Sequence, residues 1–335
     1  MNSDDVKSEE VKKNRGLDPG KAVEALKRLD HDQDLKKMIR PHCRLNPGEI
    51  WEDPVRGHRV GVLDAASLED VERIMGGKKA ELLIHDPPYN IAVGSRNTNN
   101  LSKMKLADYL AFSKKWVENS CAVMADNAHF YIWIGADQKD NFQPLPDFMI
   151  LMRDFDSLKP RSLITLRNQR GYGTQKNWMW VRQELLYYVK GKPQFRVVYT
   201  DIPKVLKGYY KTVRGVRKEN VERSKSATIR PGNVWIDIQQ VFYRMEENVP
   251  GCYAQKPIKA LERIIGASSR EESLVADFFA HSGTTLLAAE KMGRKAYTFD
   301  IDPVFAELTI RRLERYRLTG KMGWQWSNPF PELEL

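Results

Sequence analysis

Four short apolar segments each lead to an aspartate, and this pattern limits the fold more than any other feature of the chain. The segments and their aspartates are 59–63 with Asp64, 82–84 with Asp86, 273–276 with Asp277, and 295–299 with Asp300. Segments with helical spacing alternate with them, at 67–75, 106–124, 286–292 and 303–318. Strands that alternate with helices predict a largely parallel α/β sheet. Because ligands of such sheets bind at the carboxyl ends of the strands, these aspartates are candidate site residues.

Composition sets the broad class of protein. The 335 residues, 41% hydrophobic and 29% charged, suit a soluble globular protein of one large or two ordinary domains. No segment approaches the roughly 18 uncharged apolar residues of a membrane span, and residues 1–10 lack the apolar core of a signal peptide. Cys43, Cys121 and Cys252 are scattered, which fits a reducing cytoplasm and gives no disulfide framework or metal-ligand spacing. We therefore expect a cytoplasmic protein without a metal site.

The Asp-Pro-Pro-Tyr turn, residues 86–89, follows the second apolar segment. Two consecutive prolines continue neither a strand ladder nor a helix, so the chain must leave the strand there in an extended turn. Such a turn holds a carboxylate and an aromatic ring at the end of a strand. Taken alone, it is equally well a polar connection between a strand and a loop. The Gly-, Ser- and Asn-rich segment 94–103 that follows is either a loop that covers a substrate or a solvated connector.

A loop at residues 277–285 joins a predicted strand to a helix and has the sequence Asp-Phe-Phe-Ala-His-Ser-Gly-Thr-Thr. Its backbone N–H groups lie at a helix N-terminus, and the acid at 300 ends the next strand, where a carboxylate binds a ribose. The loop lacks the P-loop pattern G-x-x-x-x-G-K-[ST] and the dinucleotide pattern G-x-G-x-x-G. A ligand with an adenosine but no phosphate fits both observations, and the methyl donor S-adenosylmethionine is such a ligand. We therefore name residues 277–285 the donor loop.

Positive charge concentrates in the basic window, residues 196–230, which contains ten Lys/Arg and three Asp/Glu of a chain with net charge +10. Interleaved tyrosines accompany the charges. The window is either a solvated face or a surface that neutralises nucleic-acid phosphates. Residues 167–178 also combine Arg, Asn, Gln, Tyr and Trp, and form either a polar loop or a base-contacting one.

Together, the Asp-Pro-Pro-Tyr turn and the donor loop resemble the amino-methyltransferases of DNA. The catalytic motif comes first, the donor loop last and the basic window between them, an order similar to the β group of that family. The resemblance covers about residues 50–325. It implies a Rossmann-like S-adenosylmethionine-dependent fold, with a mostly parallel seven-stranded sheet, a circularly permuted motif order and an inserted target-recognition region. The implied regions are an N-terminal extension (1–45), a catalytic half (46–190), a basic target-recognition region (191–250), a donor-binding half (251–325) and a C-terminal tail (326–335).

The resemblance also implies roles for individual residues. Asp86, Pro87, Pro88 and Tyr89 are the catalytic candidates. The candidates for binding the methyl donor are Asp64, Lys256, Pro257, Asp277, Phe279, Ala280, His281, Ser282, Gly283, Thr284 and Asp300, with Asp300 at the ribose and Lys256-Pro257 at the donor's carboxylate end. Asp64 matches more loosely and equally well caps its own turn. The candidates for DNA contact are Arg170, Lys176, Lys204, Lys207, Lys211, Arg214, Arg217, Lys218, Arg223 and Lys225. His281 replaces the first glycine of the family's loop, where a positive φ would suit histidine better than most residues.

Direct methyl transfer to an exocyclic amine is the chemistry that these residues support. Asp86 and the Pro87 carbonyl can accept the two N–H groups of the amine and orient its lone pair, while Tyr89 stacks on a base flipped from double-stranded DNA. Ring-carbon methylation needs a cysteine that usually follows proline, and no cysteine here does. We expect an N6-adenine DNA methyltransferase. The alternatives are an N4-cytosine enzyme, a catalytically silent DNA-binding homologue, and methylation of RNA or of a protein glutamine.

The resemblance implies a cytoplasmic protein that is bacterial, archaeal or phage-encoded and associates with the nucleoid through DNA. The family also suggests a homodimer and a cognate restriction endonuclease as partners. The recognition sequence depends on contacts with bases in a DNA groove, which sequence patterns do not give.

Overall fold

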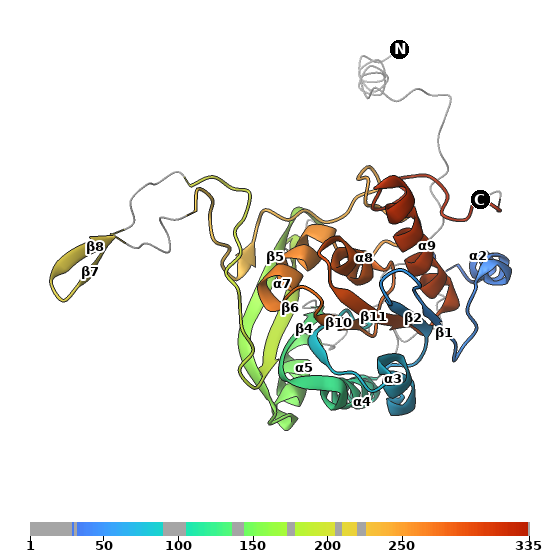
Figure 1. Cartoon of the computed structure of the whole chain (residues 1–335), viewed down its shortest axis with the longest axis horizontal. Helices are drawn as coiled ribbons and strands as arrows, with labels where there is room; N and C mark the ends of the chain where they lie inside the picture. The colour runs from blue at the N-terminus through green and yellow to red at the C-terminus, as the bar shows by residue number, and fades with distance from the viewer. Residues whose placement is uncertain are drawn as a thin grey trace, which may run out of the picture.

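The computed structural model describes residue 29 and residues 32–89, 105–135, 144–172, 178–204, 210–219 and 226–333. The loop predicted at 94–103 lies outside these residues. Across the described ranges, one large mixed sheet holds two layers of helices apart (Figure 1). No helix in these ranges is long and apolar enough to cross a membrane.

The large sheet has nine strands in the order β1-β2-β11-β10-β3-β4-β6-β5-β9. The seven inner strands match the predicted seven-stranded sheet, and two short strands, β1 and β9, extend its edges. Among the inner strands only β6 runs against the others. The strands are β1 (Ile50–Glu52), β2 (Arg59–Val62), β3 (Ala80–His85), β4 (Met124–Ile134), β5 (Leu158–Tyr172), β6 (Trp180–Lys190), β9 (Val234–Trp235), β10 (Leu274–Asp277) and β11 (Lys295–Asp300).

Strands from opposite ends of the chain are neighbours in this sheet. β10 pairs in parallel with β3, through Val275 with Leu82 and Ala276 with Leu83. The carboxyl end of β3 carries the Asp-Pro-Pro-Tyr turn, and the carboxyl end of β10 begins the donor loop. The two motifs, about 190 residues apart in the sequence, therefore meet at one edge of the sheet. This arrangement confirms the predicted fold class with its permuted motif order.

Side chains alternate between the two faces of the sheet and build a separate core on each. On one face, strand residues such as Leu82 and Ile84 pack against α7 (Ile258–Ser268), α8 (Thr284–Lys291) and α9 (Pro303–Thr319). On the other, residues such as Leu83 and Phe130 pack against α3, α4 and α5. These helices are α3 (Leu68–Met75), α4 (Leu106–Val123) and α5 (Pro144–Leu151), the last followed by the 3₁₀ helix η3 (Met152–Asp154). Figure 1 shows the two layers of helices.

Helix α3 begins and ends where the sequence predicts. The Ser67 hydroxyl accepts a hydrogen bond from the Asp70 N–H at 3.3 Å, and Gly76 closes the helix in the left-handed region with φ 54°. Asp70 is three residues after Ser67, where its side chain could bond back to the Ser67 N–H in a capping box, but it does not. Its carboxylate instead accepts the Asp64 N–H at 3.0 Å. The cap of α3 thus holds the backbone at the end of β2 in place.

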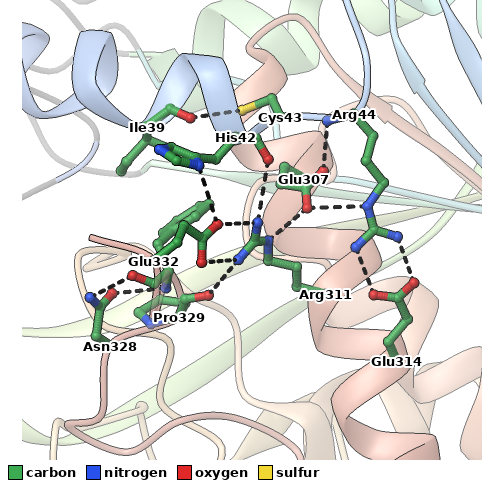
Figure 2. Close-up of polar contacts among 11 residues, drawn as sticks. Ile39, His42, Cys43, Arg44, Glu307, Arg311, Glu314, Asn328, Pro329 and Glu332 are labelled. Carbon is green, nitrogen blue, oxygen red and sulfur yellow. Dashed lines mark hydrogen bonds and ion pairs between the residues drawn. The ribbon is translucent and has the colours of Figure 1, made fainter. Parts of the chain in front are cut away.

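Segments near both termini pack against α9. Helix α2 (Gln33–Ile39) and the 3₁₀ helix η1 (Arg40–His42) lie beside it, and Ile39 shares a buried cluster with Leu308 and Phe330. Figure 2 shows the polar contacts around this cluster, in which the Arg311 guanidinium reaches Glu307 of its own helix and Glu332 of the C-terminal tail. Arg44 contacts Glu314 through both terminal nitrogens. Both segments are therefore tied to the helix that flanks the donor loop.

A separate two-stranded sheet interrupts the second half of the chain. Strands β7 (Tyr210–Val213) and β8 (Val216–Glu219) form an antiparallel hairpin that Figure 1 shows away from the main body. Its two turn residues, Arg214 and Gly215, have φ 52° and 77°. Two consecutive positive φ values are those of the type I′ turn, which matches the twist of a two-residue hairpin.

Candidate functional site

A hollow opens at the carboxyl ends of β3, β4 and β10. It encloses about 320 Å³, including its open mouth. The described residues that line it are Ile84, Asp86, Trp133, Ala254, Lys256, Leu261, Asp277, Phe279, Ala280, His281, Ser282, Thr284 and Thr285. The structure therefore brings the predicted catalytic aspartate and most of the predicted donor loop into one cavity.

The Asp86 carboxylate has a partner on each oxygen. The Tyr89 hydroxyl donates to Oδ1 at 2.6 Å, and the Lys256 ammonium contacts Oδ2 at 2.5 Å. The side chains of Asp86 and Lys256 are 20% and 9% exposed, so the ion pair is largely withdrawn from water. The family resemblance implies that Lys256 lies at the donor's carboxylate end; its contact with Asp86 was not predicted.

Asp277 lies at the floor of the hollow and is buried. Thr285 donates to its Oδ2 at 2.5 Å, and the Phe279 N–H donates to Oδ1 at 3.0 Å. Burial outweighs these hydrogen bonds and raises the pKa of Asp277 to about 7. Near neutral pH, a charged ligand would change the protonation of a carboxyl with this pKa.

The strand-end acids at 300 and 64 lie side by side. Asp300 accepts the His281 N–H at 3.0 Å and the Asp302 N–H at 2.9 Å, and burial raises its pKa to about 6. The Leu63 N–H donates to the Asp300 carbonyl, which brings the end of β2 alongside the end of β11. Asp64 caps its own turn, because its carboxylate accepts the Ala66 N–H at 2.9 Å. The turn cap therefore uses one of the two carboxylate oxygens of Asp64.

Two residues of the donor loop adopt the left-handed region. His281 has φ 44°, the positive value expected of the glycine that it replaces, and its ring lies 4.5 Å from that of Phe305. Gly283 has φ 72° and packs closely against α9, where an added Cβ would lie 2.9 Å from the Thr309 Cα. Only glycine fits at 283 without displacing the helix.

Sequence patterns missed the buried polar groups that support the hollow. Arg312 of α9 is fully buried and donates to the Ser282 carbonyl at 2.8 Å and the Thr284 hydroxyl at 2.9 Å. Burial lowers its pKa to about 10, so it stays protonated at neutral pH. The Glu247 carboxylate accepts the Ile258 N–H at 2.8 Å and so fixes the start of α7 beside Lys256-Pro257. A lone Arg or Glu within an amphipathic pattern gives no signal of such a role.

Trp133 is a second residue that the sequence did not single out. It belongs to the apolar end of β4 and lines the hollow with its ring 1% exposed. Its indole nitrogen is buried and has no hydrogen-bond partner among the described residues. A buried, unpartnered donor in a cavity wall is a position where a ligand acceptor would be stabilised.

The predicted DNA contacts fall into three groups. Lys211, Arg214, Arg217 and Lys218 are exposed on the β7–β8 hairpin, where the Arg217 guanidinium covers the Tyr210 ring at 4.6 Å. Lys204 lies outside the hairpin, and Arg170 lies in β5 with an undescribed side chain. Lys176, Lys207, Arg223 and Lys225 lie outside the described residues. Figure 1 shows the hairpin apart from β4 and β10, the strands whose carboxyl ends border the hollow.

The hollow fits an adenosine-bearing methyl donor. Its lining offers the hydroxyls of Ser282 and Thr284 and the apolar surface of Phe279. The strand-end carboxylate at 300, where a ribose binds in such folds, is not among the lining residues but accepts the N–H of His281, which is. Carboxylates at 86 and 277 face the same cavity and suit a cationic ligand. Among the described residues that line the hollow, Lys256 is the one permanent cation. These residues therefore do not provide the group of cations that a phosphate would need.

Comparisons with known proteins agree with this geometry. Residues 80–311 match the family described as DNA methylase. Type II methyltransferase M.HpaI of Haemophilus parainfluenzae is 28% identical over 234 residues, which are 70% of this chain and 68% of that protein. DNA adenine methyltransferase YhdJ of Escherichia coli (strain K12) is 26% identical over 76% of this chain and 82% of its own. The solved structure of PvuII DNA methyltransferase (cytosine-N4-specific) aligns with a TM-score of 0.51 at 16% identity, covering 80% of this chain and 95% of that chain.

Proposed function

Because the chain belongs to the DNA methylase family, we propose that it transfers a methyl group from S-adenosylmethionine to the N6 amine of a flipped adenine at a specific site in double-stranded DNA. S-adenosylmethionine is the methyl donor of this enzyme. One observation carries the proposal: Asp86, which accepts a hydrogen bond from the Tyr89 hydroxyl, lines the same hollow as the donor loop.

Asp86 and the Pro87 carbonyl orient the target amine. The lone pair of an exocyclic amine is conjugated with the ring, so the amine is a poor nucleophile until its N–H groups are held. Asp86 Oδ1 already accepts the Tyr89 hydroxyl, so we assign the amine N–H to the other oxygen, Oδ2. The hydrogen bond to Asp86 also keeps the Tyr89 ring at the turn, where a flipped base can stack on it.

The donor end of the hollow is held by residues of β10, β11 and the loop between β10 and α8. Asp300 would accept the ribose hydroxyls, and Asp277, Ser282 and Thr284 would surround the methionine portion. Asp277 must be ionised to pair with a cationic group, and its raised pKa means that binding of the donor releases a proton near neutral pH. Arg312 would maintain the loop in this conformation through Ser282 and Thr284.

We prefer adenine to cytosine as the target because the family resemblance associates aspartate at position 86 with adenine enzymes, whereas serine there is commoner in N4-cytosine enzymes. The named relatives include both an adenine enzyme and a cytosine-N4 enzyme, so N4-cytosine is the alternative. Mass spectrometry of nucleosides from DNA incubated with the protein and S-adenosylmethionine tests the choice. We expect N6-methyladenine; N4-methylcytosine without methyladenine would contradict it, and transfer to no DNA would favour a silent DNA-binding homologue.

The β7–β8 hairpin is the proposed DNA contact outside the hollow. Lys211, Arg214, Arg217 and Lys218 are all exposed, and a two-stranded ribbon fits the major groove of B-form DNA. Homodimer formation and a cognate restriction endonuclease remain predictions from the family. Sequencing of modified bases in treated DNA would identify the recognition sequence.

A further inference from the structure

Lys256 occupies the place at Asp86 that a target amine needs. Its ammonium lies 2.5 Å from Asp86 Oδ2 and is 5.4 Å from the centres of both the Tyr89 and Trp133 rings. A nitrogen that donates to Asp86 beside the Tyr89 ring is also what the proposed reaction requires of the base. The Lys256 side chain and the base therefore compete for the same carboxylate.

The competition is strong because the ion pair is poorly solvated. The Lys256 side chain is only 9% exposed, and an exocyclic amine is neutral, whereas Lys256 carries a full charge. A charged donor forms the stronger hydrogen bond with a carboxylate. A flipped base would then bind to Asp86 poorly for as long as the ammonium stays there.

The hollow contains what is needed to draw the ammonium away. Lys256 is the one permanent cation among the described residues of its lining, so the carboxylate of an amino-acid ligand has one natural partner there. The Lys256 ammonium lies over the Trp133 ring, whose indole N–H has no partner among the described residues and is a second donor in the wall of the hollow. The backbone need not move, because Glu247 holds the start of α7 while the four-carbon lysine stem rotates.

We infer that Lys256 couples donor binding to base binding: it occupies Asp86 in the donor-free protein, and the donor's carboxylate releases it so that the base can enter. The inference rests on the proposed function and deepens it. Lys256 is a positioning residue in this scheme, since it acts on the reaction through Asp86. Because such coupling is reciprocal, target DNA should also tighten binding of the donor.

Two donor analogues that differ in a single group test the coupling in the wild-type protein. S-adenosylhomocysteine keeps the carboxylate, whereas S-adenosyl-3-thiopropylamine lacks only that group. The readout is the fluorescence of 2-aminopurine placed at the methylated position of the duplex, together with the affinity for that duplex. We expect S-adenosylhomocysteine to raise the fluorescence and to tighten binding at least about fivefold, within the usual range of coupling, and the decarboxylated analogue to do neither at saturation.

Variants of two lysines near the start of α7 give the matched control. Lys256→Met should bind and flip the duplex equally with either analogue or with none. Lys259→Met removes the same charge from an adjacent, more exposed position and should keep the wild-type difference. Equal responses to the two analogues in the wild type would overturn the inference, as would an unchanged difference in a folded Lys256→Met protein. If the wild type flips the base yet transfers no methyl group to any DNA, the proposed function fails instead.

Discussion

The hollow and the β7–β8 hairpin are both charged, but they are built in opposite ways. The charged groups in and behind the hollow have partners: Asp86 with Lys256, Asp277 with Thr285, and the supporting Arg312 with backbone carbonyls. The hairpin exposes its cations and belongs to a sheet of only two strands. A two-stranded hairpin is marginally stable alone in water. The first region is ordered by the core around it, whereas the second gains most from a polyanion that binds it.

This difference separates two tasks. A reaction that depends on the orientation of one amine needs groups fixed to within a fraction of an ångström, and burial on strand ends supplies that. Recognition of a long polyanion needs many adaptable contacts, each of modest strength. We therefore expect changes in the hollow to alter the chemical step or the donor, and changes in the hairpin to alter affinity for DNA.

The sharpest test of the comparison is Asp86→Ala, for which we expect the largest effect. Loss of the group that orients the amine should lower kcat for transfer of labelled methyl groups by at least about 10³-fold. The affinity for DNA, measured by gel shift, should change little, because the hairpin is intact. Asp154→Ala, which removes an exposed carboxylate on the body, is the control. Turnover near the wild-type rate in Asp86→Ala would refute the assigned role.

Two glycines with positive φ test whether the hollow is the tighter structure. Gly283→Ala places a Cβ 2.9 Å from the Thr309 backbone, and this overlap with the strain of φ 72° should lower the free energy of unfolding by about 2–4 kcal/mol. Gly215→Ala has similar strain at φ 77°, but its Cβ meets nothing within 4 Å. Its free energy of unfolding should therefore fall by the strain alone, about 1–2 kcal/mol. Equal losses in the two variants would show that strain, not close packing, governs the donor loop.

Predictability from sequence also differs between the two regions. Strands that end in Asp64, Asp86, Asp277 and Asp300 are local patterns, so the fold and the candidate residues at the sheet edge could be anticipated. The pairing of Lys256 with Asp86 joins residues 170 positions apart and depends on how α7 packs, which no local pattern encodes. The hairpin was missed for another reason. Its turn is Arg-Gly, not the Asn-Gly or Asp-Gly that usually marks a type I′ turn.

The hairpin's role can be tested by removing its four cations. A variant with all four changed to Gln should bind DNA about tenfold or more weakly at physiological salt. The slope of its log affinity against log salt should fall by as much as about 3.6. The four changed residues are Lys211, Arg214, Arg217 and Lys218. The control variant removes the same charge from four exposed positions of the body, by changing to Gln the residues Lys114, Lys115, Arg153 and Lys159. An equal loss of affinity in this control would mean that net charge, not the hairpin, determines binding. Donor affinity without DNA should be unchanged in both proteins.

Near neutral pH the smallest effect concerns protons, and it lies within the hollow alone. Burial raises the pKa of Asp277 to about 7 from an ordinary value of 3.8, so the donor-free folded state binds a proton more tightly than the unfolded chain does. This group therefore opposes folding increasingly as pH rises from about 4 to 7, and the free energy of unfolding should fall over that window. Binding of a cationic ligand needs the ionised form. Donor affinity should rise with pH by up to about tenfold per unit below 7 and then level off.

Calorimetry in buffers of different ionisation enthalpy would measure the proton released on donor binding at pH 6. Asp277→Asn should bind the donor more weakly at pH 8 and should lose both the proton release and the pH dependence of affinity. The hairpin variant should retain both, because none of its cations lies near Asp277 in the hollow. If Asp277→Asn still released a proton, Asp300, whose pKa burial raises to about 6, would be the group that titrates.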